Sequence, residues 1–194
     1  MAPTETKPGN RPYHHGDLRR AILAAALDVI AADGPAALSL RDLARRAGVS
    51  HAAPAHHFKD RTGLLTAIAA EGFGLLADTL REASDLKDAG VRYVRFARAR
   101  PAHFAVMFAP ELLRPDDLEL TTARALATDT LRDAVAAVRS EDYGVDARLA
   151  SVAAWSLAHG FATLLLGHNL DAAVGDKDPE EVFRTLAATL FRAL

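Results

Sequence analysis

The most informative absence in this chain is cysteine, which does not occur among its 194 residues. Disulfide bonds, thiolate metal sites and cysteine nucleophiles are therefore excluded. No uninterrupted apolar run approaches the roughly 20 residues that a helix needs to cross a bilayer. The first ten residues are polar and contain two prolines, unlike a secretory signal. These absences predict a cytoplasmic protein that does not enter the membrane.

The sequence motifs of common enzymes are also missing. The chain contains no HExxH zinc motif, no phosphate-binding P-loop and no GxGxxG dinucleotide fingerprint. Ser156 and His159 would lie one helical turn apart, but they have no evident acidic partner, which argues against a hydrolytic triad. The adjacent His56 and His57 would point about 100° apart on a helix, so they cannot both bind one metal ion. We therefore expect no enzyme activity, no cofactor and no metal site.

The charge of the chain is small overall but unevenly distributed. The formal net charge is −2, and half of the residues are apolar, which is typical of a soluble globular protein. Residues 1–65 contain nine basic and six acidic side chains, whereas residues 66–194 contain the other 14 basic and 19 acidic ones. A mildly basic front part indicates contact with a polyanion, although an excess of this size is common by chance.

Apolar residues recur at three- and four-residue steps along most of the chain, which predicts an all-α fold of about nine helices. The first helix should begin at Gly16 and end at Asp33-Gly34-Pro35, since proline cannot continue a helix. Ser39 and Asp42 have the spacing of a capping-box variant that would open the second helix. The predicted helices cover approximately residues 16–33, 39–47, 50–58, 60–83, 91–100, 102–109, 115–140, 146–167 and 179–194, with a loop at 168–178.

The stretch from residue 39 to residue 61, SLRDLARRAGVSHAAPAHHFKDR, has the pattern of a helix-turn-helix. Gly48 can adopt the backbone conformation that the turn demands, and Val49 would fill the corner between the two helices. Ala44 is small enough to let the second helix approach closely. An ordinary αα-hairpin has the same periodicity, so the pattern alone leaves both interpretations open.

Four motifs in the first part of the chain occur in an order typical of one protein family. They are Asp17-Leu-Arg-Arg-Ala-Ile-Leu-Ala-Ala-Ala26, then Gly34 with Leu38-Ser-Leu-Arg-Asp-Leu-Ala44, then Ala47-Gly-Val-Ser50, and finally His57-Phe58 followed by Arg61, Leu64 and Leu65. With these motifs, residues 15–73 resemble the DNA-binding domain of the TetR/AcrR family of bacterial transcriptional regulators. The later segments Trp155-Ser-Leu-Ala-His-Gly160 and 93–108 resemble a C-terminal domain class of this family with a Trp…His-Gly signature.

The resemblance implies how the protein is organised and how it acts. It implies a flexible basic arm at 1–15, a helix-turn-helix DNA-binding domain at 16–76 and a regulatory domain at 77–194. Members of the family are all-helical homodimers that release operator DNA when a small molecule binds. Their last two helices, here 146–167 and 179–194, usually form the dimer interface. The expected partners are therefore double-stranded operator DNA, a small-molecule effector and a second copy of the chain.

Residue chemistry within this resemblance gives candidate contacts to DNA. Base-edge contacts are predicted for Arg41, His51, Ala53 and His56, and phosphate contacts for Arg11, Ser39, Ser50, His57, Lys59 and Arg61. The chain departs from the family pattern at three of its positions. Ala55 replaces a tyrosine that commonly meets a phosphate, Arg61 replaces a lysine, and Pro54 would delay the start of the recognition helix by one or two residues. The connection at 83–90 is also short, which would reshape the effector pocket.

Candidate effector contacts are the large apolar residues of the predicted regulatory helices and the few polar groups among them. They are Phe73, Phe96, His103, Phe104, Met107, Phe108, Trp155, His159, Phe161 and Thr163. Pro101 and Pro110 interrupt the helices there, which hinders close packing and favours a cavity. The alternative is that these residues fill a dry core. For Trp155 and His159, core packing with a hydrogen-bonded imidazole is the simpler interpretation.

Two functions remain open at this stage. The first is a ligand-responsive regulator, most simply a repressor that a small apolar molecule releases from a palindromic operator. The second is a helical small-molecule-binding protein whose DNA affinity is weak or lost, which Ala55 and the modest positive charge of the front part suggest.

Overall fold

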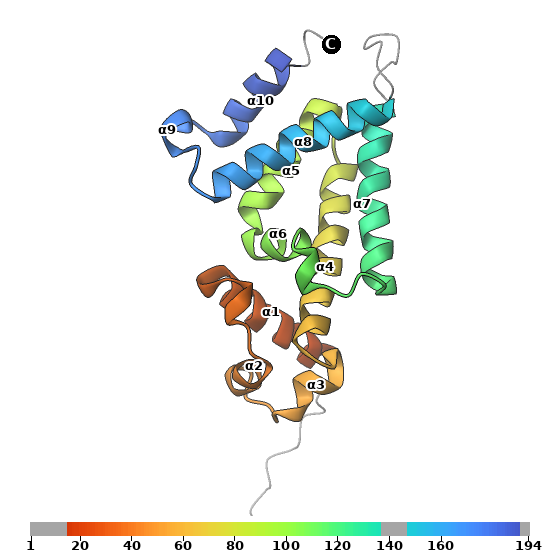
Figure 1. Ribbon diagram of the computed structural model, residues 1–194, viewed down its shortest axis with the longest axis vertical. Helices are drawn as coiled ribbons and strands as arrows, with labels where there is room; N and C mark the ends of the chain where they lie inside the picture. Colours follow the sequence, from red (N-terminus) through yellow and green to blue (C-terminus); the bar gives the residue numbers. More distant parts are fainter. Residues whose placement is uncertain (1–14, 137–146, 191–194) are drawn as a thin grey trace, which may run out of the picture.

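The computed structural model describes residues 15–136 and 147–190, and every regular element within these ranges is helical. This confirms the predicted all-α class. The elements are α1 (His15–Asp33), η1 (Pro35–Ala37), α2 (Leu40–Arg46), α3 (Ala52–Phe58), α4 (Arg61–Arg81), α5 (Leu86–Ala99), α6 (Pro101–Met107), η2 (Pro110–Leu112), α7 (Leu118–Ala136), α8 (Ala147–Leu166), α9 (Asp171–Val174) and α10 (Pro179–Leu190). Helices α1 to α3 pack together at one end of the elongated molecule (Figure 1).

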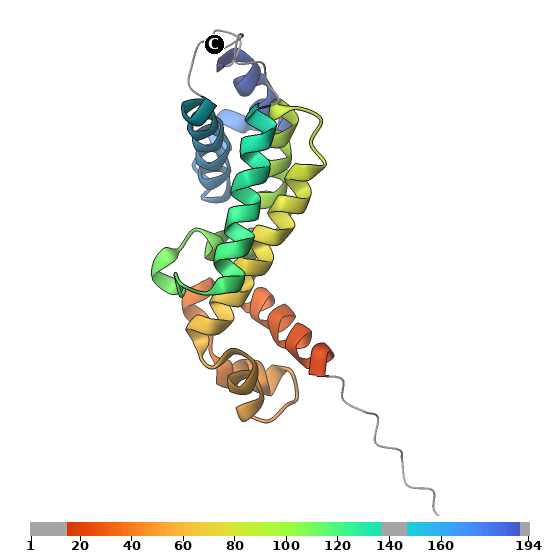
Figure 2. The same ribbon diagram turned by 90° about the vertical axis from the view of Figure 1, so that its right-hand side faces the viewer.

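Helix α4 joins the two ends of the molecule. It begins beside α3 and continues without a break among the upper helices, where α7 packs along it (Figures 1 and 2). Helix α6 packs against α4 and also contacts α1, while α5 packs against α8 and α10. The domain boundary that we predicted at residue 76 therefore falls inside one continuous helix.

The apolar positions that predicted the helices form one continuous core through both ends of the molecule. Ile22 and Leu43 are fully buried at the end formed by α1 to α3, and Ile68, Met107 and Leu120 are buried further along. Burying one such side chain completely contributes about 1.5–3 kcal/mol to the free energy of unfolding. Because the core is continuous, the two ends are joined by packing as well as by α4.

Several helix ends are set by capping residues. Helix α1 stops at Gly34 as predicted, where a φ of 78° favours glycine and Pro35 follows. Helix α4 begins after Asp60, whose Oδ1 accepts a hydrogen bond from the Gly63 N–H at 2.8 Å. Ser39 occupies the N-cap position of α2 without a side-chain cap bond, so the predicted capping box is wrong. The Asp42 carboxylate that would complete the box pairs instead with Arg45 at 3.1 Å.

Other element boundaries differ from the prediction for local reasons. Helix α5 begins before the predicted start at residue 91 because Asp85 caps it, accepting from the Asp88 N–H at 2.8 Å. Helix α7 begins at Leu118, since Asp117 accepts from the Leu120 N–H at 3.0 Å. The short helix α9 lies in the predicted loop at 168–178. The predicted helical residues 137–140, 146 and 191–194 lie outside the described residues.

Candidate DNA-binding surface and effector cavity

Helix α2, a tight turn and helix α3 form the helix-turn-helix predicted for residues 39–61. The turn depends on Gly48, whose φ of 65° lies in the left-handed region that favours glycine. The Val49 N–H closes the turn by donating to the Ala44 carbonyl at 3.0 Å. Leu43 and Ala44 are fully buried, so the inner face of α2 packs into the core.

The recognition helix α3 begins at Ala52 with His51 in the N-cap position, one residue later than a cap at Ser50 would place it. Pro54 is therefore in the first turn, where its missing N–H leaves no intrahelical hydrogen bond unmade. Pro54 and Phe58 are both buried, and they fix the inner face of α3. The sequence indicated only that Pro54 would delay the start of the helix, and its place in the core was not predicted.

The outer face of the helix-turn-helix carries most of the residues predicted to contact DNA. Arg41, Ser50, His51, His56 and Lys59 are exposed, whereas Ser39, Ala53 and His57 are partly buried. The His56 and His57 rings meet edge to face with their centroids 5.6 Å apart. Among the described residues, no three histidine or acidic side chains are grouped to hold a metal ion. Arg11 lies outside the described residues, and contacts of all these side chains with DNA stay predictions.

Arg61 is placed differently from the other predicted contacts. Its Nη2 donates to the Pro35 carbonyl at 2.6 Å, and its Nε donates to the Leu38 carbonyl at 3.2 Å. The guanidinium therefore ties the start of α4 to the segment that precedes α2. The sequence carries no signal for this structural role, because the two carbonyls lie 26 and 23 residues away along the chain. A phosphate contact by the same side chain stays a prediction.

Several predicted effector contacts form an aromatic cluster around His159 of α8. The imidazole centroid lies 4.5 Å from that of Phe108, 5.3 Å from Phe104 and 5.5 Å from Trp155. Its Nδ1 is hydrogen-bonded to the Tyr93 hydroxyl at 2.9 Å. Burial lowers the pKa of His159 and raises that of Tyr93. His159 is thus a neutral, hydrogen-bonded histidine at the centre of the cluster.

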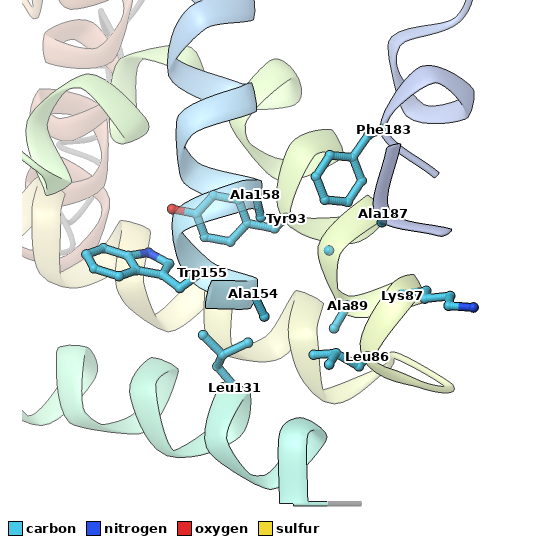
Figure 3. A pocket seen from close by; sticks show the side chains of 11 residues that line it. Leu86, Lys87, Ala89, Tyr93, Leu131, Ala154, Trp155, Ala158, Phe183 and Ala187 are labelled. Atoms are coloured by element: carbon cyan, nitrogen blue, oxygen red, sulfur yellow. The ribbon is translucent and has the colours of Figure 1, made fainter. Parts of the chain in front are cut away.

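A small hollow lies beside this cluster, between α5, α7, α8 and α10 (Figure 3). Trp155 and Tyr93 belong to both the hollow and the cluster. Gly90 lets α10 approach α5 closely, since a Cβ there would lie 2.7 Å from Cε1 of Phe183. The wall is mostly apolar, and Lys87 is the one charged side chain among the described residues that form it. The lining residues are Leu86, Lys87, Ala89, Gly90, Tyr93, Leu131, Ala154, Trp155, Ala158, Phe183 and Ala187.

The structure places the other predicted effector contacts mainly in the core. Less than a tenth of the surface of Phe73, Phe96, Met107 and Phe161 is exposed, and none of them lines the hollow. Thr163 is exposed and is not among the residues that line this hollow, so its contact with an effector stays a prediction. Helix α8 is apolar on several sides, which hides from the sequence the side that faces solvent.

His103 of α6 is a buried polar group whose Nε2 has no hydrogen-bond partner among the residues that the structure describes. Its side chain lies between α6 and α4, where Nε2 is 3.6 Å from the Glu71 carboxylate. Burial lowers the pKa of His103, and Arg100 adds to this effect, whereas Glu71 opposes it. His103 is therefore neutral near pH 7, and it belongs to the packing of α6 rather than to the hollow.

We expect the free energy of unfolding to fall as the pH drops below about 6.5, the pKa of a histidine in an unfolded chain. The unfolded state then binds a proton that the buried His103 takes up less readily, so acid favours unfolding. Denaturant unfolding between pH 7 and pH 5 should show a weaker pH dependence for His103→Gln than for the wild type. His159→Gln serves as a separate comparison because burial lowers the pKa of His159 as well. An unchanged pH dependence in His103→Gln would contradict this assignment.

Helices α8 and α10 present an apolar face to solvent. It consists of Leu149, Val152 and Leu164 on α8 and of Leu186 and Leu190 on α10, and Leu149 is 62% exposed. Both α4 and α8 are long and apolar enough to span a membrane, but α4 is mostly buried in the protein while α8 is mostly exposed. An exposed apolar face of this kind marks an interaction surface. It lies on the two helices for which the dimer interface was predicted.

Each of the two parts of the molecule matches a model of a known protein family. Residues 22–68 match the family model described as "Bacterial regulatory proteins, tetR family", and residues 86–190 match the one described as "Tetracyclin repressor-like, C-terminal domain". The second match alone covers more than half of the chain. No curated protein matches the chain.

Solved structures show the same fold over nearly the whole length. A protein of unknown function from Rhodococcus sp. RHA1 is 35% identical, with a TM-score of 0.79 over 95% of this chain and 99% of its own. The TetR family transcriptional regulator PfmR from Thermus thermophilus is 26% identical, with a TM-score of 0.62 over 88% of this chain and 97% of its own. Together with the helix-turn-helix geometry, these matches show that this chain belongs to the TetR family of bacterial regulatory proteins.

Proposed function

We propose that this chain is a ligand-responsive repressor that binds a palindromic operator and releases it when a small apolar molecule is bound. The observation that carries the proposal is the two-sided recognition helix. Pro54 and Phe58 hold its inner face in the core, while His51 and His56 are exposed on its outer face beside Arg41 of α2. A rigid helix with polar, base-reading side chains directed outward is what major-groove recognition requires.

A second copy of the chain would cover the apolar face of α8 and α10. Regulators of this family act as dimers on operator DNA, and the exposed leucines lie on the two helices that family members use for this contact. A two-fold dimer would present two recognition helices to an imperfect palindrome. Its half-sites would lie about one DNA turn apart, or a multiple of that distance.

The effector would occupy the hollow beside Trp155 and Tyr93. Its apolar lining favours a mostly apolar molecule, and the Tyr93 side chain would orient one polar group of it. Release of DNA by the effector implies the reciprocal effect, so the operator complex should bind the effector less tightly than the free protein does. These properties describe a cytoplasmic regulator rather than an enzyme.

Replacing Arg41 with alanine tests the DNA-binding part of the proposal. A bidentate contact from arginine to guanine contributes about 1–3 kcal/mol to discrimination between bases, so operator affinity should fall about 5- to 150-fold. The affinity for an unrelated duplex should change far less. Titration with the operator duplex and with an unrelated duplex of equal length measures the two losses in affinity. Arg132→Ala is the matched control because Arg132 is exposed on α7 and pairs with Asp129 of the same helix.

Equal losses on both duplexes would reduce Arg41 to a phosphate contact, and no loss on either would remove it from the interface. The alternative function, a small-molecule-binding protein with weak DNA affinity, is favoured by Ala55, which is exposed where the family commonly has a phosphate-binding tyrosine. A mobility-shift measurement with the promoter region that flanks the gene distinguishes the two functions. A shift at nanomolar to micromolar protein supports the repressor.

A further inference from the structure

The segment before α7 contacts the DNA-binding end of the molecule. Its key residue is Arg114, which follows η2 and belongs to the regulatory part of the chain. Nη2 of Arg114 donates to Oδ2 of Asp60 at 2.6 Å, and the Arg114 backbone N–H donates to the Thr66 hydroxyl at 3.0 Å. These partners lie 54 and 48 residues earlier in the sequence. The contact therefore links two parts of the chain that the fold brings together.

Asp60 occupies the corner between the recognition helix and α4. It comes two residues after Phe58, the last residue of α3, and its backbone N–H donates to the Phe58 carbonyl at 2.9 Å. Its two carboxylate oxygens have different partners, since Oδ1 caps α4 through the Gly63 N–H and Oδ2 accepts from Arg114. The hydrogen bond from Gly63 lowers the pKa of Asp60, with a further contribution from Arg114. The corner thus carries a carboxylate that stays charged at neutral pH.

Gly63 makes room for the guanidinium at this corner. A Cβ on Gly63 would lie 2.7 Å from Nη1 of Arg114 and 2.0 Å from the Phe58 carbonyl oxygen. The Arg114 side chain and the last carbonyl of the recognition helix therefore approach α4 at the same point. Arg114 is thus linked to the end of α3 through Asp60, whose backbone N–H donates to the Phe58 carbonyl.

The first turn of α7 makes a second contact with the DNA-binding end. Glu119 lies 3.7 Å from the guanidinium of Arg19 on α1. The same guanidinium lies 5.5 Å from the centroid of the Phe58 ring. Residues 114–119 thus contact both the corner after α3 and the helix on which Phe58 packs.

The other end of α7 reaches the hollow. Leu131 of α7 is one of its lining residues. From Leu118 to Leu131 the helix extends about 20 Å at 1.5 Å per residue, and it packs along α4 over its length (Figure 2). One helix therefore has its C-terminal half at the candidate effector site and its N-terminal end at the corner that holds the recognition helix.

We propose that Arg114 is a positioning residue that couples α7 to the recognition helix through Asp60, so that displacement of α7 at the hollow changes the orientation of α3. This inference rests on the proposed repressor function for its biological meaning, but the mechanical link can be tested without DNA. Arg114 and Asp60 are both partly exposed, so their ion pair adds little to the free energy of unfolding. Its effect is on the relative position of two helices.

A distance measurement tests the link directly. The chain has no cysteine, so spin labels can be attached at Ala55→Cys on α3 and Ala125→Cys on α7, both exposed. Labelled protein is diluted with unlabelled protein so that only one subunit of a dimer carries labels. We expect a narrow distance distribution in the otherwise unchanged chain and in Arg132→Ala. Arg114→Ala should broaden or shift it, and so should Asp60→Ser, because serine retains an N-cap oxygen but cannot bind Arg114. An unchanged distribution in both variants would overturn the proposal.

Operator binding gives the second readout. Arg114→Ala should weaken binding to a duplex selected by the wild type about five- to tenfold, with the affinity for an unrelated duplex and the thermal midpoint nearly unchanged. The double variant Arg114→Ala/Asp60→Ser should lose no more than either single variant, because both remove one interaction. Additive losses, or equal losses on both duplexes, would overturn the link. If the wild type itself selects no duplex, the repressor function fails, while the distance measurement still decides whether Arg114 positions α3.

Discussion

Replacing Leu186 with glutamate should turn the dimer into monomers and weaken operator binding by at least about 100-fold. Leu186 is exposed on the apolar face of α10 in the isolated chain, and a glutamate in the proposed interface would be a buried charge without a partner. The loss in operator affinity is large because the second half-site is otherwise bound at the high effective concentration that the dimer provides. Light scattering measures the mass, and titration with the operator duplex measures the affinity.

Thr185→Glu is the matched control for this substitution. Thr185 is exposed on α10 as well, but it is displaced by about 100° around the helix from Leu186. It adds the same charge to the same turn, so a general loss of helix α10 would appear in both variants. A monomer for Leu186→Glu with a dimer for Thr185→Glu places the interface on the apolar face. Dimers of unchanged mass for Leu186→Glu and Leu190→Glu would contradict this interface.

Local signals explain the features that could be predicted from the sequence. Gly34 followed by Pro35 ends α1, and Gly48 permits the tight turn between α2 and α3. Both signals act on the backbone of their own segment, since glycine adopts a positive φ and proline cannot continue a helix. The apolar periodicity likewise predicted the long helices α4 and α8, since it records which side of a helix is buried. Together these signals were sufficient for the all-α class and for the helix-turn-helix.

Features that depend on contacts between distant segments could not be predicted in this way. The carbonyl partners of Arg61 and the carboxylate partner of Arg114 lie on other elements, and neither arginine carries a sequence signal that indicates its partner. The division of the candidate effector residues between the core and the hollow could not be predicted for a related reason. Apolar periodicity does not distinguish a phenylalanine that fills the core, such as Phe96, from an aromatic residue that lines a hollow, such as Trp155.

Phe104→Ala should destabilise the protein much more than Trp155→Ala, although each removes one aromatic ring from the same cluster. Phe104 is 6% exposed and lies within 6.0 Å of the Tyr93, Phe108 and His159 rings. Its removal leaves a cavity in the core and should lower the free energy of unfolding by about 3–5 kcal/mol. Trp155 is 42% exposed, so its removal should cost less than about 2 kcal/mol. Denaturant unfolding of both variants measures the difference.

The release of operator by an effector distinguishes the roles of Trp155 and Phe104 further. An apolar compound that releases operator from the wild type should no longer release it from Trp155→Ala, although this variant stays folded and binds the operator. Trp155 is the chain's one tryptophan, so its fluorescence should change as the wild type binds the compound. Trp155→Phe keeps a ring at the wall of the hollow and should retain part of the response. If Trp155→Ala releases the operator as the wild type does, the effector binds away from this hollow. If it unfolds like Phe104→Ala, Trp155 belongs to the core despite its exposure.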